Sequence, residues 1–282
     1  MVRFLALVVV LLFDLAGAST QPEHMPANEL VRQIVANELK AENQDHSHWK
    51  FRLRTEKPGS PSEVDEVVET KAGDLQFPVS IDDRQVNASE KQRAEERIEQ
   101  VKRDPAALKE SLKDKSEDSN RSQHMLQMLP DAFIFSYGKR EGELVQLDFR
   151  PKADFRPATR EDEVFHAMAG TLSVDVKKQR IARISGHLIQ EVKFAGGLLG
   201  HLDKGGIFDV KQEEVSPGYW ELTVLNVQMT GRVLFFKTIA VHQQCSRSNF
   251  QRVPDNLTVA QAAEMLHNAE QIALFSRQHG RI

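Results

Sequence analysis

A run of alternating apolar and polar residues between Gly170 and Val241 constrains the fold of this chain more than any other feature of its sequence. A period of two gives each segment one apolar face, which is the pattern of half-buried β-strands. Apolar residues take every second position in two sets: Leu172, Val174 and Val176, then Trp220, Leu222 and Val224. The predicted strands span residues 170–176, 180–189, 190–194, 207–215, 220–227 and 232–241. Short connections between successive strands favour antiparallel pairing, so the sequence predicts an antiparallel sheet with one apolar face.

Helices and further strands are predicted on both sides of this stretch, so the expected fold class is α+β. Apolar residues near helical spacing predict a first helix over 27–39, with Asn28 as its candidate N-cap. Strands are also predicted at 49–54, 64–70, 74–81, 132–137 and 144–149, and helices at 89–115 (a charged pair), 123–129, 159–168 and 258–267. Thr159 and Asp162 stand at capping-box spacing before one of these helices. We expect polar linkers or loops at 116–122 and 246–255.

The N-terminus has the pattern of a secretory signal peptide. Arg3 supplies the positive charge, residues 4–13 are apolar, and Ala18 ends a small-residue cleavage site. The apolar run is about half of the roughly twenty residues that a membrane-spanning helix needs, although a retained anchor is the alternative. We therefore expect a signal peptide over 1–18, cleaved near Ala18, and a linker over 19–26. The mature protein is then periplasmic, or secreted.

Composition argues against several classes of partner. The 37 basic and 41 acidic residues give a formal net charge of −4, which provides no basic field for a nucleic acid. The interleaved charges of residues 88–119 are typical of a solvated helical insertion rather than a basic arm. Cys245 is the single cysteine, so no intramolecular disulfide can form, and we expect it to pack as a small hydrophobe.

The sequence contains no recognisable catalytic arrangement. His46 and His48 could face the same side of a strand, but two histidines without a third ligand do not make a zinc site. The glycine-rich segment 196–206 lacks the Gly-Lys-Ser/Thr ending of a phosphate loop and is predicted to be a flexible connection that forms a mobile rim. No Gly-x-Ser-x-Gly or His-Glu-x-x-His pattern is present. We expect no enzyme activity, no metal and no cofactor.

Three segments together resemble a known family of exported bacterial proteins. They are residues 156–159 leading to 168–175, then 180–186, and finally 205–208 with 217–220. In these segments the chain is similar to outer-membrane lipoprotein-sorting proteins, such as the periplasmic lipoprotein carrier. That resemblance covers about the C-terminal half, and it implies a strongly curved antiparallel β-sheet, an open half-barrel, with helices across its concave face. The charged helical pair is an addition to that fold. The resemblance also implies an apolar cavity that receives lipid chains.

These observations predict a single half-barrel domain over 27–250, with a C-terminal helix and tail over 251–282. The expected function is non-catalytic binding of a hydrophobic ligand, a lipid acyl chain or a lipoprotein, by a monomer. Aromatic residues of the predicted strands are the candidates for the cavity lining, with core packing as the alternative for each: Phe133, Phe135, Phe149, Phe194, Phe208, Trp220 and Phe235, with Phe236 beside them. The other function left open is an envelope-sensor or interaction module that binds an envelope protein partner without lipid transfer.

Overall fold

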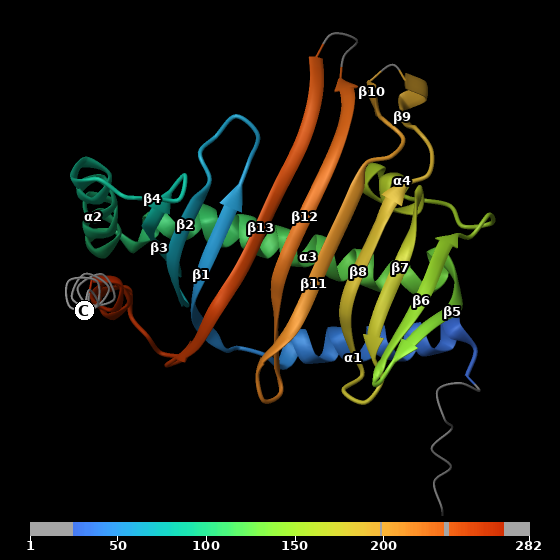
Figure 1. Ribbon diagram of the computed structural model, residues 1–282, viewed down its shortest axis with the longest axis horizontal. Coiled ribbons are helices and arrows are strands. Elements are labelled where there is room, and N and C mark those ends of the chain that lie inside the picture. The colour runs from blue at the N-terminus through green and yellow to red at the C-terminus, as the bar shows by residue number, and fades with distance from the viewer. Residues whose placement is uncertain (1–24, 198, 234–236, 268–282) are drawn as a thin grey trace, which may run out of the picture.

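The alternating segments assemble into one antiparallel sheet of 13 strands in a computed structural model, which describes residues 25–197, 199–233 and 237–267. Along the sheet the order is β4-β3-β2-β1-β13-β12-β11-β8-β7-β6-β5, and β9 and β10 form a side hairpin that pairs with β12. The strands are β1 (His48–Glu56), β2 (Glu63–Thr70), β3 (Gly73–Ile81), β4 (Arg84–Gln85), β5 (Phe133–Glu141), β6 (Leu144–Pro151), β7 (Met168–Asp175), β8 (Arg180–Leu188), β9 (Val192–Phe194), β10 (Gly200–Leu202), β11 (Ile207–Ser216), β12 (Tyr219–Val233) and β13 (Lys237–Val253). The two ends of this order, β4 and β5, do not pair with each other, so the sheet is open (Figure 1).

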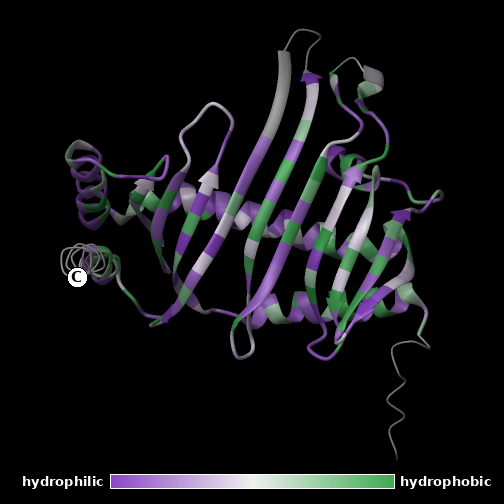
Figure 2. Ribbon diagram, viewed as in Figure 1, coloured by the Kyte–Doolittle hydropathy of each residue, from purple (hydrophilic) through white to green (hydrophobic). Residues whose placement is uncertain are grey.

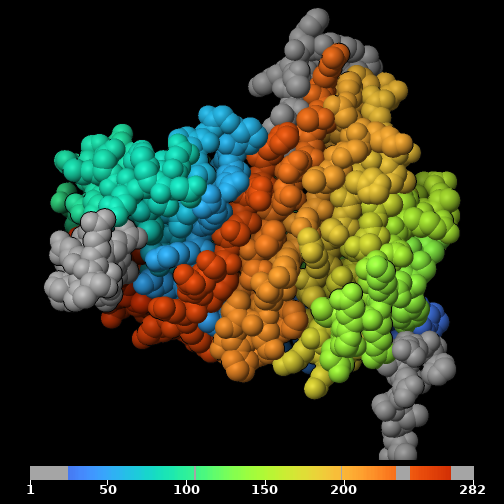
Figure 3. Space-filling view, in the orientation of Figure 1, coloured from blue at the N-terminus to red at the C-terminus, as the bar shows by residue number. Residues whose placement is uncertain are grey.

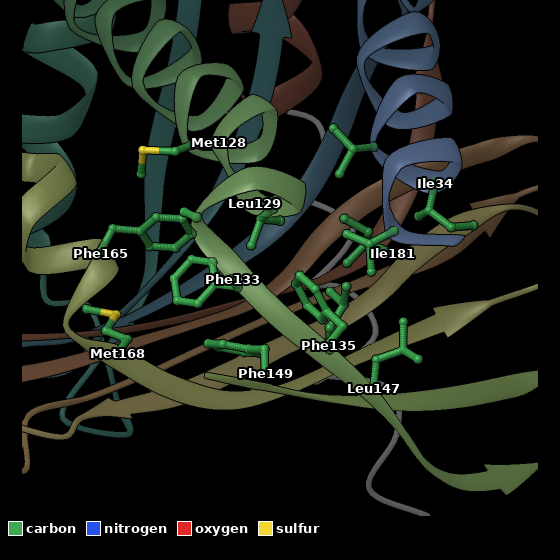
Figure 4. Packing of buried hydrophobic residues seen from close by; sticks show 14 of the residues in the cluster. Ile34, Met128, Leu129, Phe133, Phe135, Leu147, Phe149, Phe165, Met168 and Ile181 are labelled. Carbon is green, nitrogen blue, oxygen red and sulfur yellow. The ribbon is translucent and has the colours of Figure 1, made fainter. Parts of the chain in front are cut away.

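Two helices lie across one face of the sheet, which we call the helix-covered face (Figure 1). They are α1 (Ala27–Gln44) and α3 (Lys109–Ala132). The other helical segments are α2 (Ala88–Arg103), α4 (Arg160–His166), residues 259–267 and the short 3-10 turns η2 (Pro105–Leu108) and η3 (Ala195–Gly197). The main core lies between α1, the end of α3 and strands β5 to β8, where Phe133, Phe149 and Leu129 pack closely (Figure 4). The prediction of an α+β protein with a large antiparallel sheet is therefore confirmed.

The first helix is amphipathic because its apolar residues recur at helical spacing: Leu30, Val31, Ile34 and Val35 are all buried. Asn28 does not cap this helix as predicted, since the N-cap position is Pro26. The Asn28 side chain instead pairs with the edge of the sheet. Its Nδ2 donates to the carbonyls of Pro130 at 3.0 Å and Phe133 at 2.7 Å, and its Oδ1 accepts from the backbone N of Phe135 at 3.0 Å. An edge strand that would otherwise expose these groups is thereby blunted.

Replacing Asn28 with alanine should destabilise the protein by about 1–3 kcal/mol, because part-buried backbone groups of β5 lose their partners. Asn37→Ala on the same helix is the matched control, since Asn37 makes one exposed hydrogen bond, to the carbonyl of Gln179. Both substitutions replace an asparagine of the helix with alanine and gain the same helix propensity. The difference between their free energies of unfolding therefore measures the contact of Asn28 with the edge strand β5. Urea unfolding measures both, and equal midpoints would contradict this role for Asn28.

The third helix corrects the prediction of a polar linker at 116–122. Residues 109–132 form one continuous helix of 24 residues, with Pro130 in its last turn. The helix was not predicted here because Lys113 to Asp118 are exposed and have no apolar residues at helical spacing, which is the pattern that indicates an amphipathic helix. The charged segment therefore begins with α2 and η2 and then leads into a helix that spans the sheet (Figure 1).

A second, smaller layer covers one end of the opposite face. Neighbouring residues of a strand point to opposite faces, and Val67 packs with Trp49 and Phe51 while Val68 packs with Ala94 of α2. Residues 259–267 join this layer through Val259, Ala262, Ala263 and Leu266. The rest of that face is formed by the strands themselves (Figure 3). The predicted C-terminal helix is thus confirmed over the described residues.

The longest hairpin of the sheet, β12 with β13, also differs from the predicted strands. One strand runs from Tyr219 to Val233, through the residues expected to connect two strands, and its partner continues to Val253, so the predicted loop at 246–255 is wrong over most of its length. Gly231 lies inside β12 because β10 approaches closely there. A Cβ at this position would stand 2.2 Å from the carbonyl oxygen of His201. The second half of β13 is mostly polar and therefore lacks the alternating pattern that predicts a strand. It is a strand because it pairs with β1, which lies near the N-terminal end of the described chain.

Two further predictions concern the ends of helices and of the chain. Thr159 caps α4, and Asp162 completes the predicted capping box. The predicted signal peptide lies outside the described residues. Within residues 25–267, apart from 198 and 234–236, no helix is long and apolar enough to cross a membrane.

Candidate functional site

A row of mostly apolar side chains crosses the middle of the helix-covered face. Residues directly opposite in antiparallel strands lie on the same face, and the registers connect Leu172 to Ile184, Ile184 to Val210, Val210 to Leu225 and Leu225 to Cys245. We call these five residues the cross-strand row. Apolar and polar bands alternate along these strands (Figure 2). The register of the sheet therefore gathers alternate residues of five strands into one apolar strip.

Burial decreases along this row from the β7 end toward the middle of the sheet. Leu172 is 0% exposed, whereas Ile184, Val210 and Leu225 keep part of their surface accessible. Val227 and Met229 on β12 are also only partly buried against the main core. Apolar side chains on the covered face of a sheet are normally buried fully, so the middle of the row lacks part of its packing.

The arrangement of the helices accounts for this. α1 makes its main sheet contacts with β5 and β8, and α3 makes its own with β5 at one end and β3 at the other. Between these ends, residues 116–122 of α3 are exposed apart from Ser119, which is half-buried. A helix that is polar all round bridges between packed regions without burying a face. The row under the middle of α3 is therefore less covered than the cores at its two ends.

Most of the predicted cavity residues lie in the main core instead of on this strip. Phe133, Phe135, Phe149 and Phe208 are buried there, at 0%, 6%, 3% and 9% exposure. Phe194 is partly buried against the same core, and Trp220 lies under the guanidinium of Arg180, 5.4 Å from Cζ to the ring centroid. Phe235 and Phe236 lie outside the described residues. Sequence reasoning weighted aromatic rings and so missed the smaller aliphatic residues of the row.

The sheet divides at the lower end of the β12–β13 hairpin. These strands pair from Val224 and Ser246 to the top of the hairpin, but below this point β12 pairs with β11 and β13 pairs with β1. Aromatic rings of both branches meet in the split: Trp49, Phe51, Tyr219 and Phe250. The Trp49 ring makes edge contacts with Tyr219 and Phe250, at centroid distances of 5.7 and 6.2 Å. The split is thus held by aromatic packing in place of backbone hydrogen bonds.

Charged groups gather beside this split, under the N-terminal half of α3. Lys115 Nζ of α3 lies 2.9 Å from Glu69 Oε1 and 3.2 Å from Asp74 Oδ2. Glu69 Oε2 also accepts from the backbone N of Trp49 at 3.0 Å. Arg247 and Glu221 stand on the two branches: Arg247 directly follows the last paired residue of β13, Ser246, and Glu221 lies three positions from the last paired residue of β12, Val224. Sequence reasoning missed both, because Arg247 fell in a predicted loop and Glu221 occupies a polar position of an alternating strand.

Glu221 is the group beside the split whose ionisation the fold perturbs strongly. Burial raises its pKa from 4.5 to about 7, and the negative charges of Glu69 and Asp45 act in the same direction, while Arg247 and Lys115 oppose it. No hydrogen bond to its carboxyl group occurs among the residues that the structure describes. Below pH 7 this carboxyl is therefore mostly neutral.

Glu221→Gln should stabilise the protein at pH 8 but not at pH 4.5. A raised carboxyl pKa means that the folded state binds the proton more tightly, so stability falls as pH rises from 4.5 through about 7. Removing the ionisable group should restore about 1–3 kcal/mol above that range, after allowance for residual exposure. Urea unfolding at the two pH values measures this.

The matched control for this prediction is Glu213→Gln, directly opposite on β11. Hydrogen bonds from Lys211 and Thr223 lower the pKa of Glu213, so its ionised form stabilises the fold at neutral pH and the control should lose stability at pH 8. If Glu221→Gln were destabilising at pH 8 as well, the carboxylate would have a stabilising partner, contrary to the proposed environment.

The remaining reactive groups offer little chemistry. Cys245 is buried within the row, and burial raises the pKa of its thiol, so it packs as an uncharged group. His48 Nδ1 is buried and has no hydrogen-bond partner within the described part of the chain. Among the described residues, no group of three or more His, Cys, Asp or Glu side chains could hold a metal ion.

Comparison with protein-family models, with curated proteins and with solved structures finds no match for this chain.

Proposed function

We propose that this chain is an exported, periplasmic or secreted protein that binds a hydrophobic ligand, a lipid acyl chain or lipoprotein segment, without catalysing a reaction. In this proposal the open sheet acts as a half-barrel, and the ligand lies between the cross-strand row and the helices. The observation that carries it is the incomplete burial of Ile184, Val210 and Leu225 on a face that two helices cover. The resemblance to lipoprotein-sorting proteins and the signal-peptide pattern support the same assignment.

Burial of an acyl chain on the cross-strand row would provide enough free energy for reversible binding. Each methylene removed from water contributes about 0.8 kcal/mol, so an acyl chain of roughly a dozen carbons could gain close to 10 kcal/mol. Association and ordering cost several kcal/mol of this. The remainder, about 4–6 kcal/mol, corresponds to a dissociation constant between about 40 µM and 1 mM, which suits a protein that must also release its ligand.

The most direct test begins with lipid extraction. The full chain is purified without detergent, its lipids are extracted, and mass spectrometry identifies any acyl compound. The mature protein is then titrated with N-phenylnaphthylamine, whose fluorescence rises in an apolar site, and dodecanoate is used to displace it. We expect a co-purified acyl lipid and saturable, displaceable binding.

Two neighbouring substitutions locate the site. Leu225→Trp should fill the space over the row and reduce probe binding about tenfold or more, because the added ring occupies the place of the ligand. Val224→Trp is the control, since Val224 is similarly half-buried on the same strand but faces the opposite side of the sheet. It should bind the probe as the unchanged protein does.

Absence of both extractable lipid and saturable probe binding would overturn the proposal. Equal binding by both tryptophan variants would also contradict it, because the ligand could not then lie on the row. In either case the alternative of an envelope protein partner bound through the charged helices would gain support. Deletion of residues 89–115 would then be expected to abolish that interaction.

A further inference from the structure

Arg247 is a charged group beside the row whose hydrogen bonding is incomplete among the described residues. Its guanidinium lies over the ring of Phe51, with Cζ 5.1 Å from the centroid. Within the part of the chain that the structure describes, its Nε is buried without a hydrogen-bond partner, and it forms no ion pair. A buried guanidinium N–H normally has a carboxylate or another acceptor. The Nε–H of Arg247 has none among the described residues, although the side chain as a whole is only partly buried, so a ligand could supply the acceptor.

The nearby acids do not supply that acceptor. Glu69 is held by Lys115 and by the backbone N of Trp49, and Asp74 is held by the same lysine. Glu221 is close enough to Arg247 for their charges to interact, yet no ion pair joins them. Its carboxyl is mostly neutral below pH 7 and can then donate a hydrogen bond to an oxygen.

The position of Arg247 relates it directly to the cross-strand row. It follows Cys245 by two positions on β13 and lies opposite Leu53, so it shares the face that carries the row. Two positions along a strand correspond to roughly 7 Å. The sheet also divides at this residue, which leaves no β12 partner strand beside it. A chain lying on Leu225 and Cys245 would bring its end to the guanidinium.

We propose that Arg247 binds the oxyanion head group of an amphiphile whose apolar chain lies on the cross-strand row, with Glu221 completing the head-group site. This inference rests on the proposed function and adds the chemical class of the ligand. A carboxylate and a phosphate share the required chemistry, since each presents acceptor oxygens that a guanidinium binds with two N–H groups. Charge-assisted hydrogen bonds of this kind change affinity by about 10- to 100-fold.

The test compares four amphiphiles with the same dodecyl chain by displacement of N-phenylnaphthylamine: dodecanoate, dodecyl phosphate, dodecanol and dodecyltrimethylammonium. The two anions should bind about 10- to 100-fold more tightly than the alcohol, and the preference between them identifies the head group. In Arg247→Met, which keeps an unbranched apolar side chain beside Phe51 but removes the guanidinium, the anions should bind no better than the alcohol.

Arg183→Met is the matched control. Arg183 precedes Ile184 of the row, lies on the opposite face, and binds Asp209 through two contacts of 2.6 Å. Its removal should leave the selectivity for anions unchanged. If Arg247→Met also retains that selectivity, or if the cationic amphiphile binds more tightly than the anions, the head-group site is wrong. Binding of dodecanol equal to that of dodecanoate by the unchanged protein would likewise overturn it.

Glu221→Gln gives a second readout that does not depend on the stability of the arginine variant. The groups that act on Glu221 are Glu69 from β2, Asp45 after α1, Lys115 from α3 and Arg247 from β13. Because the neutral carboxyl favours an anionic head, dodecanoate affinity should fall as pH rises through about 7. Glu221→Gln should remove this pH dependence, and an unchanged profile would contradict the site. If no amphiphile binds, dodecanol included, the proposed function itself fails, which separates that outcome from failure of the head-group site.

Discussion

Replacing Gly170 with alanine is expected to destabilise the protein by about 4 kcal/mol or more, enough to prevent stable folding. Gly170 on β7 lies opposite Gly186 on β8. A Cβ on Gly170 would stand 2.0 Å from the carbonyl oxygen of Ser185 and 2.5 Å from the Cα of Gly186. Both atoms belong to the backbone, so the two strands would have to separate in the middle of the sheet. Urea unfolding, or the yield of soluble protein, measures the loss.

Gly138→Ala on β5 is the control for this effect. A Cβ there would lie 3.3 Å from Asp148 Oδ2, the end of a flexible side chain that can move. We expect a change within about 1 kcal/mol. Similar losses in the two variants would show that the contact between β7 and β8 is looser than the register indicates.

Glu38→Ala should be the next most damaging change, with a loss of about 3–5 kcal/mol. Glu38 of α1 is 4% exposed, and its Oε1 accepts from Arg180 Nε at 2.9 Å and from the backbone N of Ile181 at 2.5 Å. Removing the carboxylate leaves a desolvated guanidinium and a buried backbone N–H without partners. The contact also attaches α1 to β8, so its loss should loosen the helix over the row. Chemical denaturation and hydrogen exchange of α1 measure the two effects.

Two comparisons sharpen that experiment. Glu42→Ala, one turn further along α1, removes an exposed hydrogen bond to Ser119 and should change stability by about 0.5 kcal/mol or less. The double variant Glu38→Leu with Arg180→Met removes both charges at once and should recover most of the stability, because a buried ion pair can often be replaced by apolar side chains. If Glu38→Ala behaves like Glu42→Ala, the ion pair does not anchor the helix.

The capping box and the strands of residues 168–216 show what local sequence can specify. Thr159 and Asp162 meet through bonds between near neighbours, and alternation such as that of Leu172 and Val174 follows from the two-residue period of a strand. Such features need no knowledge of the distant chain. They are among the parts of the fold that the sequence predicted correctly.

The candidate site depends on contacts that sequence patterns do not encode. Ile184, Val210 and Leu225 come together through strand register, and a shift of one residue would turn each to the other face. Arg247 belongs to a polar segment that becomes a strand only because β1 pairs with it. The polar middle of α3 is a helix between two packed ends, although it has no apolar face of its own.

By itself, then, the sequence determined an α+β protein with an antiparallel sheet, apolar on one face, and several of its helix ends, because those features arise from neighbouring residues. Only the tertiary structure decided which apolar residues are fully buried, where the sheet divides, and that Arg247 and Glu221 stand beside the row. Each of these depends on segments far apart in the chain, such as β1 with β13 and Glu38 with Arg180. Register and burial are properties of the assembled sheet, and no local pattern of residues specifies them.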